Sequence, residues 1–128
     1  MARPKTVGPT DKELRILNIL WECGPSTVRQ VHGHFDGSTG YTTTLKLMQI
    51  MAEKGLVWRD ERAKTHIYHP KDQKEDIQAR IIGNILEHVF SGSAEKLVMH
   101  ALSAKMVSTG ELQRIKEFIK NYEIHKSS

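Results

Sequence analysis

Residues 10–70 contain an abrupt change of hydrophobic period, and this change constrains the fold more than any other feature. As far as Gly55, apolar residues recur every three or four positions, which is typical of helices that bury one face. Directly afterwards, residues 56–60 and 65–69 are rich in β-branched and aromatic side chains, which favour strands. The charged segment 61–64 between them is short enough to form a hairpin turn. The sequence therefore predicts several helices followed at once by one β-hairpin.

Capping and turn signals divide the helical stretch into three helices. Thr10 and Glu13 have the spacing of a capping box, and glycine-containing turns interrupt the pattern twice before Gly55. The expected helices run from Thr10 to Cys23, from Ser26 or Thr27 to about Phe35, and from Thr42 or Thr43 to Lys54. Three short-linked helices followed by a hairpin are the order of a winged helix-turn-helix. We therefore predict a mainly α fold with a small β-hairpin, in which residues 1–70 form the winged-helix domain.

Residues 71–128 are expected to form a second, helical domain. Their apolar positions make stripes that are wider than one neighbouring helix would cover, and three helices in fewer than 60 residues would be marginal alone. A symmetric partner would cover these stripes, so we interpret the segment as a dimerisation tail. The alternative is that it packs back on its own first domain. The residues expected at the dimer interface are Ile81, Ile85, Val89, Leu97, Leu102, Leu112, Ile115 and Ile119.

Several function classes find no support in the sequence. No run of about 18 apolar residues is present, and the basic start of the chain has no apolar stretch behind it, so neither a membrane span nor a secretory signal is expected. Cys23 is the only cysteine, which excludes an intrachain disulfide and a cysteine metal cage. These features indicate a cytoplasmic protein. No nucleophile, phosphate-loop or dinucleotide motif is present, so we expect no enzyme and no cofactor.

The seven histidines do not predict a metal site. His66 and His69 are three residues apart in an expected strand, where their side chains point to opposite faces. His32 and His34 lie at the end of a short helix, and the others are scattered along later helices. Ordinary surface or half-buried histidines are the preferred interpretation, with no metal ligand among them.

Double-stranded DNA is the partner that the first domain favours. With 19 Lys and Arg against 15 Asp and Glu, the net charge is +4, which permits binding to nucleic acid. The recognition helix of such a fold presents its N-terminal residues to the major groove, and its wing approaches phosphates. The residues expected to contact DNA are Tyr41, Thr42, Thr43 and Lys46 on the third helix and Arg59, Arg62 and Lys64 on the hairpin. Simpler roles stay open, with Thr42 or Thr43 capping the helix and Arg62 and Lys64 solvating a turn.

Three segments resemble the penicillinase-repressor family (the BlaI/MecI/CopY type) of bacterial transcriptional regulators. They are Thr10–Trp21, Tyr41–Val57, and Val89–Val98 followed by Glu111–Ile115, and the likeness extends over about residues 8–122. The resemblance implies a cytoplasmic homodimeric repressor whose winged helices occupy the half-sites of an inverted repeat. It also implies DNA contacts at positions 42, 43 and 46 and phosphate contacts from the wing.

The departures from the family pattern concern the DNA sequence that is preferred and the signal that releases the repressor. Many relatives carry a basic residue where this chain has Leu45 or Ile50, so no base preference transfers. The Asn-Phe bond that is cut in β-lactam-responsive members aligns with His100-Ala101, and the tail has no cysteine cluster of the copper-responsive type. The inducer and any sensor or protease partner therefore stay open. A further reading, in which the winged helix is a protein-interaction module of a larger assembly, also stays open.

Overall fold

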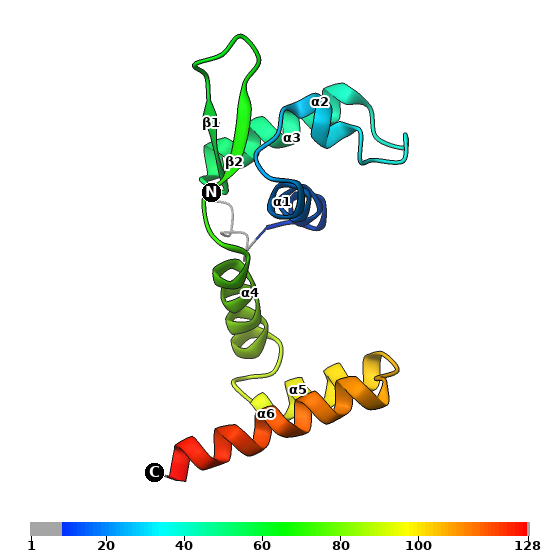
Figure 1. Ribbon diagram of the computed structural model, residues 1–128, viewed down its shortest axis with the longest axis vertical. Coiled ribbons are helices and arrows are strands. Elements are labelled where there is room, and N and C mark those ends of the chain that lie inside the picture. Colours follow the sequence, from blue (N-terminus) through cyan, green and yellow to red (C-terminus); the bar gives the residue numbers. More distant parts are fainter. Residues whose placement is uncertain (1–8, 128) are drawn as a thin grey trace. The chain divides into compact units, whose positions relative to one another are not determined.

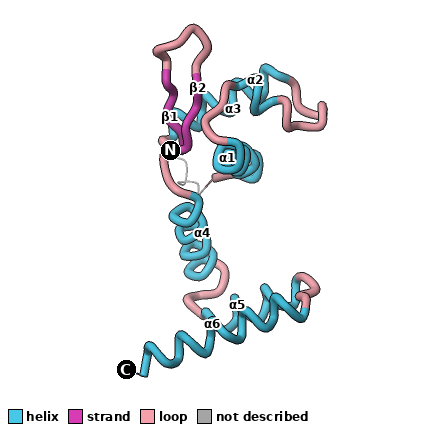
Figure 2. Tube along the Cα trace, viewed as in Figure 1, coloured by secondary structure: helices cyan, strands magenta, loops and turns pink. Residues whose placement is uncertain are grey.

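The computed structural model describes residues 9–127, which are mostly helical with one β-hairpin (Figures 1 and 2). The helices are α1 (Asp11–Cys23), α2 (Val28–His32), α3 (Tyr41–Lys54), α4 (Lys74–His88), α5 (Ala94–Ala104) and α6 (Thr109–Ser127). The strands are β1 (Val57–Asp60) and β2 (Ile67–Pro70), which pair antiparallel. This order confirms the predicted fold class, a winged helix-turn-helix followed by a helical tail.

The described residues form two compact units, which divide between Ile85 and Leu86. The division falls inside α4, so this helix contributes to both units. Its first part belongs with the winged helix, since Ile77 is buried and the indole N–H of Trp21 donates to the carbonyl of Asp72 at 3.1 Å. The domain boundary that the sequence places at Pro70 stays a prediction.

The core of the first unit lies where α1, α2, α3 and the hairpin meet. Its buried side chains are Ile16, Leu17, Leu20, Val28, Val31, Met48, Met51, Val57 and Tyr68. In α1, Ile16 is buried, whereas Leu14 is only half-buried. The buried stripe of α1 thus follows Glu13, Ile16, Leu17 and Leu20, a spacing of three to four residues that fits one helix face.

The hairpin is attached to the helices through β2. One edge of β2 pairs with β1, in a register that sets Arg59 opposite Tyr68. Its other edge pairs with the linker between α1 and α2, where Ser26 and Tyr68 exchange two backbone hydrogen bonds of 3.1 and 2.8 Å. The Tyr68 side chain is itself fully buried. The base of the wing is therefore held by both main-chain bonds and core packing.

The second helix is shorter than the sequence suggested. It ends at His32, and the amides of His34 and Phe35 donate to carbonyls three residues back, so tight turns replace the last helical turn. Thr27, rather than Ser26, is its cap, in a reciprocal capping box with Gln30. The strands also lie one or two residues later than the expected segments 56–60 and 65–69.

The second unit contains α5 and α6, and neither helix has a buried residue. Ser93 caps α5, and the Ser108 hydroxyl accepts from the amide of Glu111 at the start of α6. No helix in residues 9–127 is long and apolar enough to cross a membrane.

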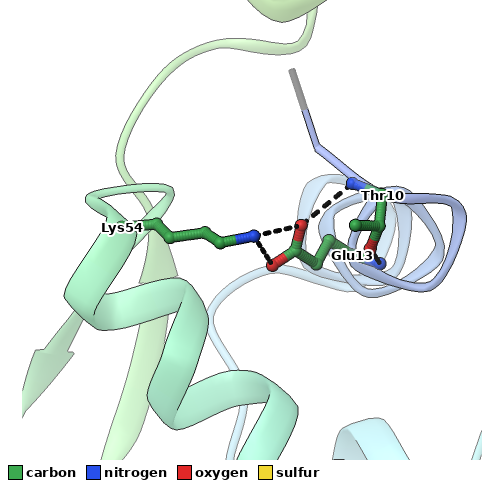
Figure 3. Close-up of polar contacts among 3 residues, drawn as sticks. All are labelled: Thr10, Glu13 and Lys54. Atoms are coloured by element: carbon green, nitrogen blue, oxygen red, sulfur yellow. Dashed lines mark hydrogen bonds and ion pairs between the residues drawn. The ribbon is translucent and has the colours of Figure 1, made fainter. Parts of the chain in front are cut away.

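One buried charge joins the start of α1 to the end of α3 (Figure 3). Glu13 is 1% exposed and accepts hydrogen bonds from the Thr10 amide at 2.9 Å and from Lys54 Nζ at 3.0 and 3.2 Å. Burial raises the pKa of this carboxyl, but the bonds from Thr10 and the charge of Lys54 outweigh that effect, so the pKa lies below the ordinary 4.5. Glu13 therefore stays ionised at neutral pH and ties the start of α1 to the end of α3.

A Glu13→Gln variant tests this ion pair. Removing the charge should lower the free energy of unfolding by about 1–2 kcal/mol at pH 7, because Lys54 is partly solvated and loses only a screened partner. A carboxyl with a lowered folded pKa stabilises above its unfolded pKa and loses that contribution as the pH falls through the folded value. Below about pH 4.5, the free energies of unfolding of the parent and the variant, measured with urea, should therefore approach each other. A difference in the free energy of unfolding that stays constant down to pH 2.5 would contradict this account.

Candidate nucleic-acid interface

The N-terminus of α3 is set by backbone geometry and not by a side-chain cap. Gly40 is the N-cap residue in an extended conformation, and its carbonyl accepts from the amides of Thr43 and Thr44. The helix therefore begins at Tyr41, one or two residues before the expected start. Thr42 and Thr43 lie inside the first turn with exposed side chains, so the capping role left open for them is not the one they have.

Two side chains of α2 hold Tyr41 at the start of α3. The ring of His32 meets the Tyr41 ring edge-on at 5.6 Å, and the guanidinium of Arg29 lies over the same ring at 5.1 Å from its centre. His32 Nδ1 also lies 2.9 Å from the hydroxyl of the buried Thr44. Tyr41, which is 39% exposed, is therefore fixed by contacts from the preceding helix.

The outward face of α3 carries three of the predicted residues. Thr42, Thr43 and Lys46 are all exposed, whereas Thr44 and Met48 face the core. Lys46 is two residues from each of these buried positions, which places it on the opposite side of the helix. This face of α3 therefore presents two hydroxyl groups and one cation next to the fixed Tyr41.

The wing brings its predicted arginines together with carboxylates. Arg59 pairs with Glu61, and Arg62 pairs with Asp60 through a 2.7 Å contact, although the Arg62 side chain is 89% exposed. Hydrogen bonds from Arg62 lower the pKa of Asp60 to about 2, so this carboxylate is charged at neutral pH. Lys64 is also exposed, and no ion pair is found for it among residues 9–127. Ion pairs of this kind at the surface are weak, so each arginine can exchange its carboxylate for another anion.

A hollow of about 320 Å³ lies between α2, α3 and the hairpin. Its walls include the cations Arg29, Arg59 and Lys64, together with Tyr41 and His66. Within the described chain, no carboxylate lines this hollow. The arrangement suits an anion, since three positive side chains from three elements converge on one space.

Arg29 and His66 were missed by the sequence reasoning. Arg29 is on α2, for which the sequence predicted only a helix, and His66 was considered only as a metal ligand. The available signal for Arg29 was its position two residues after the capping threonine, on the polar side of a short helix. The structure adds these two residues to Tyr41, Arg59 and Lys64 around one hollow.

The residues expected at a dimer interface are exposed or only half-buried in the described chain. Val89, Leu102, Leu112 and Ile119 are 67, 37, 38 and 47% exposed. Ile81, Ile85, Leu97 and Ile115 are half-buried. Large apolar side chains at Phe118 and Tyr122 are exposed as well, at 70 and 60%. The second unit thus presents an apolar surface that lacks a cover within residues 9–127.

The described residues do not gather the side chains that a metal ion needs. No group of three or more His, Cys, Asp or Glu is close enough to hold a metal among residues 9–127. Cys23 and His34 do approach each other, with Sγ and Nε2 3.7 Å apart on the surface. Two such groups alone fall short of the four ligands of a structural zinc site.

Comparison with known proteins finds one family. The model of the penicillinase repressor family matches residues 9–121. The chain is also similar to proteins described as transcriptional regulator BlaI in two strains of Mycobacterium tuberculosis, CDC 1551 / Oshkosh and ATCC 25618 / H37Rv. Each is 33% identical over 96 residues, which cover 70% of this chain and 68% of the relative. The match to the family model runs through the winged helix and most of the tail.

The positions of Thr27 and Thr42 predict different effects on stability. Thr27→Ala should cost about 0.5–2 kcal/mol, because the Thr27 hydroxyl accepts from the Gln30 amide at the start of α2. Thr42→Ala should change stability by less than about 0.5 kcal/mol, because Thr42 is exposed inside the first turn and alanine favours helix. Urea unfolding of both variants checks this. Equal losses would restore the capping role of Thr42.

Proposed function

The chain belongs to the penicillinase-repressor family, and on this basis we propose that it is a transcriptional repressor that binds an inverted-repeat DNA operator as a homodimer. The observation that carries the proposal is the exposed face of α3 beside the cation-lined hollow. In a winged helix these are the surfaces that meet the major groove and the flanking phosphates. One winged helix would occupy each half-site.

In the proposed complex, α3 enters the major groove with its N-terminal turn foremost. The hydroxyls of Thr42 and Thr43 and the first amides of the helix would meet phosphate, because helix N-termini bind anions. Lys46 is one turn further along and would reach a base edge or a phosphate. Tyr41, held by Arg29 and His32, would set the angle at which α3 enters.

The hollow beside α3 would take a backbone phosphate. Arg29, Arg59 and Lys64 line it, and Arg62 extends from the hairpin turn. In free protein, Glu61 and Asp60 neutralise two of these arginines. DNA phosphates would compete for them, and counterion release would make the binding strongly salt-dependent.

The homodimer rests on the second unit. The two helices α5 and α6 bury no residue in the single chain, while Val89, Phe118 and Tyr122 are each at least 60% exposed. Large apolar side chains left exposed in this number indicate an interaction surface. A two-fold partner that presents the same face would cover it, and such a partner would match the two-fold symmetry of an inverted repeat.

Selection of bound fragments from genomic DNA of the source organism tests the proposed function. The full chain, near physiological salt, should enrich an inverted repeat at promoters. The Lys46→Ala variant is the control: it should enrich this repeat weakly or not at all while keeping the circular dichroism spectrum of the parent. No enriched site, with only salt-sensitive background binding, would contradict the proposal and favour a protein-interaction module.

If α6 lies in the dimer interface, a double variant of this helix should be monomeric in solution. Ile115→Asp with Ile119→Asp should give monomers of 14.6 kDa, because two carboxylates cannot be desolvated in an apolar interface. The control is Gln113→Asp with Asn121→Asp, which puts the same charges on the opposite side of α6 and should leave the dimer intact. Static light scattering measures both. A double isoleucine variant that stays dimeric would refute the assignment of this face.

A further inference from the structure

The outward face of α3 contains a recess that is distinct from the cation-lined hollow. Its volume is about 220 Å³, and it is lined by Thr42, Thr43, Lys46, Leu47 and Ile50. Positions 42, 46 and 50 follow each other every four residues, and 43 and 47 form the adjacent row, so the five share one face of the helix. The surface of the recess is mostly carbon, from aliphatic side chains and threonine methyl groups.

Part of this apolar surface does not belong to the core. Leu47 packs against the edge of the core cluster, but within residues 9–127 that cluster does not include Ile50, which is half-buried. A branched aliphatic side chain beside the exposed Thr42, Thr43 and Lys46 is therefore directed at whatever α3 binds. Its chemistry indicates that the bound surface is partly apolar.

The charges around the recess identify an anionic partner. Lys46 forms part of the lining, and Arg29, Arg59 and Lys64 line the hollow that adjoins α3 on another side. An uncharged apolar protein surface would have to desolvate these cations without compensation. The major groove of DNA offers phosphates for the cations and, at each thymine, one methyl group on an otherwise polar base edge.

We propose that this recess reads thymine, with Ile50 and Leu47 contacting the 5-methyl group in the major groove and Lys46 pairing with a neighbouring acceptor. The inference rests on the proposed DNA-binding function and specifies the base that α3 selects. Within the described chain, Arg, Asn and Gln are absent from the lining of the recess, and Lys46 is its one charged hydrogen-bond donor. Discrimination at this point of the operator would therefore come from an apolar contact.

Deoxyuridine substitution tests the proposal, because uracil differs from thymine only by the missing methyl group. Each thymine of the selected operator is replaced in turn, and the dissociation constant of the full chain is measured by fluorescence anisotropy. At one or two thymines in each half-site, the substitution should weaken binding about three- to five-fold, the order expected for one buried methyl group. Thymines outside the footprint should show no change.

Variants of α3 test whether the recess causes the loss of affinity with deoxyuridine. Ile50→Ala should weaken binding to the thymine operator and make it less sensitive to deoxyuridine, so the two changes should not be additive. Ile50→Val keeps a branched side chain and should retain part of the discrimination, which separates a lost contact from a damaged fold. Lys64→Ala is the matched control, since it should weaken binding to both DNAs by the same factor.

The outcomes separate this inference from the proposed function. If the chain selects an operator but tolerates uracil at every thymine, thymine reading is wrong and the repressor proposal stands. If uracil weakens binding equally in the parent and in Ile50→Ala, the methyl group is read elsewhere and the recess is wrongly assigned. If no operator is selected at all, both proposals fail.

Discussion

Tyr68 is the residue on which the geometry of the first unit depends. Its side chain is fully buried among residues of α1, α2 and α3, while its main chain pairs with Arg59 on one edge and with Ser26 on the other. Buried backbone groups must be paired, so this strand cannot shift along either neighbour without losing several bonds at once. The base of the hairpin is therefore fixed beside the helices of the first unit.

The proposed binding surface combines rigid and adjustable parts. Tyr41 is held between Arg29 and His32, and Glu13 with Lys54 ties the other end of α3 to α1. The wing differs, since Arg62 is 89% exposed and its ion pair with Asp60 is local to the turn. A fixed helix suits base contacts, which need accurate placement, whereas phosphates tolerate a looser partner. The fixed helix and the exposed wing thus match the two kinds of contact that DNA binding requires.

Hydrophobic period and capping signals were sufficient to predict the order of the elements. Residues 10–70 give clear changes of period, and the caps at Thr10, Ser93 and Ser108 are local in sequence. The start of α3 was less predictable, because Gly40 caps it with backbone alone and leaves no side-chain signal. The hollow was not predicted: Arg59 and Lys64 were named from the sequence, but Arg29 lines the same space only once the first unit is folded. The recess at Ile50 was likewise hidden, because the sequence does not tell which apolar residues the core leaves uncovered.

The bare apolar surface of α5 and α6 has a consequence for how such a chain would behave in a cell. Under the proposed assembly, a newly made copy would hold these helices without a cover until it met another copy. Stability and chain concentration would then be linked, because partner binding stabilises only the associated form. Occupancy of a two-half-site operator would rise with the square of the copy number while monomers predominate. A modest increase in synthesis or turnover would thus change gene silencing steeply, and single copies would be the form most open to degradation.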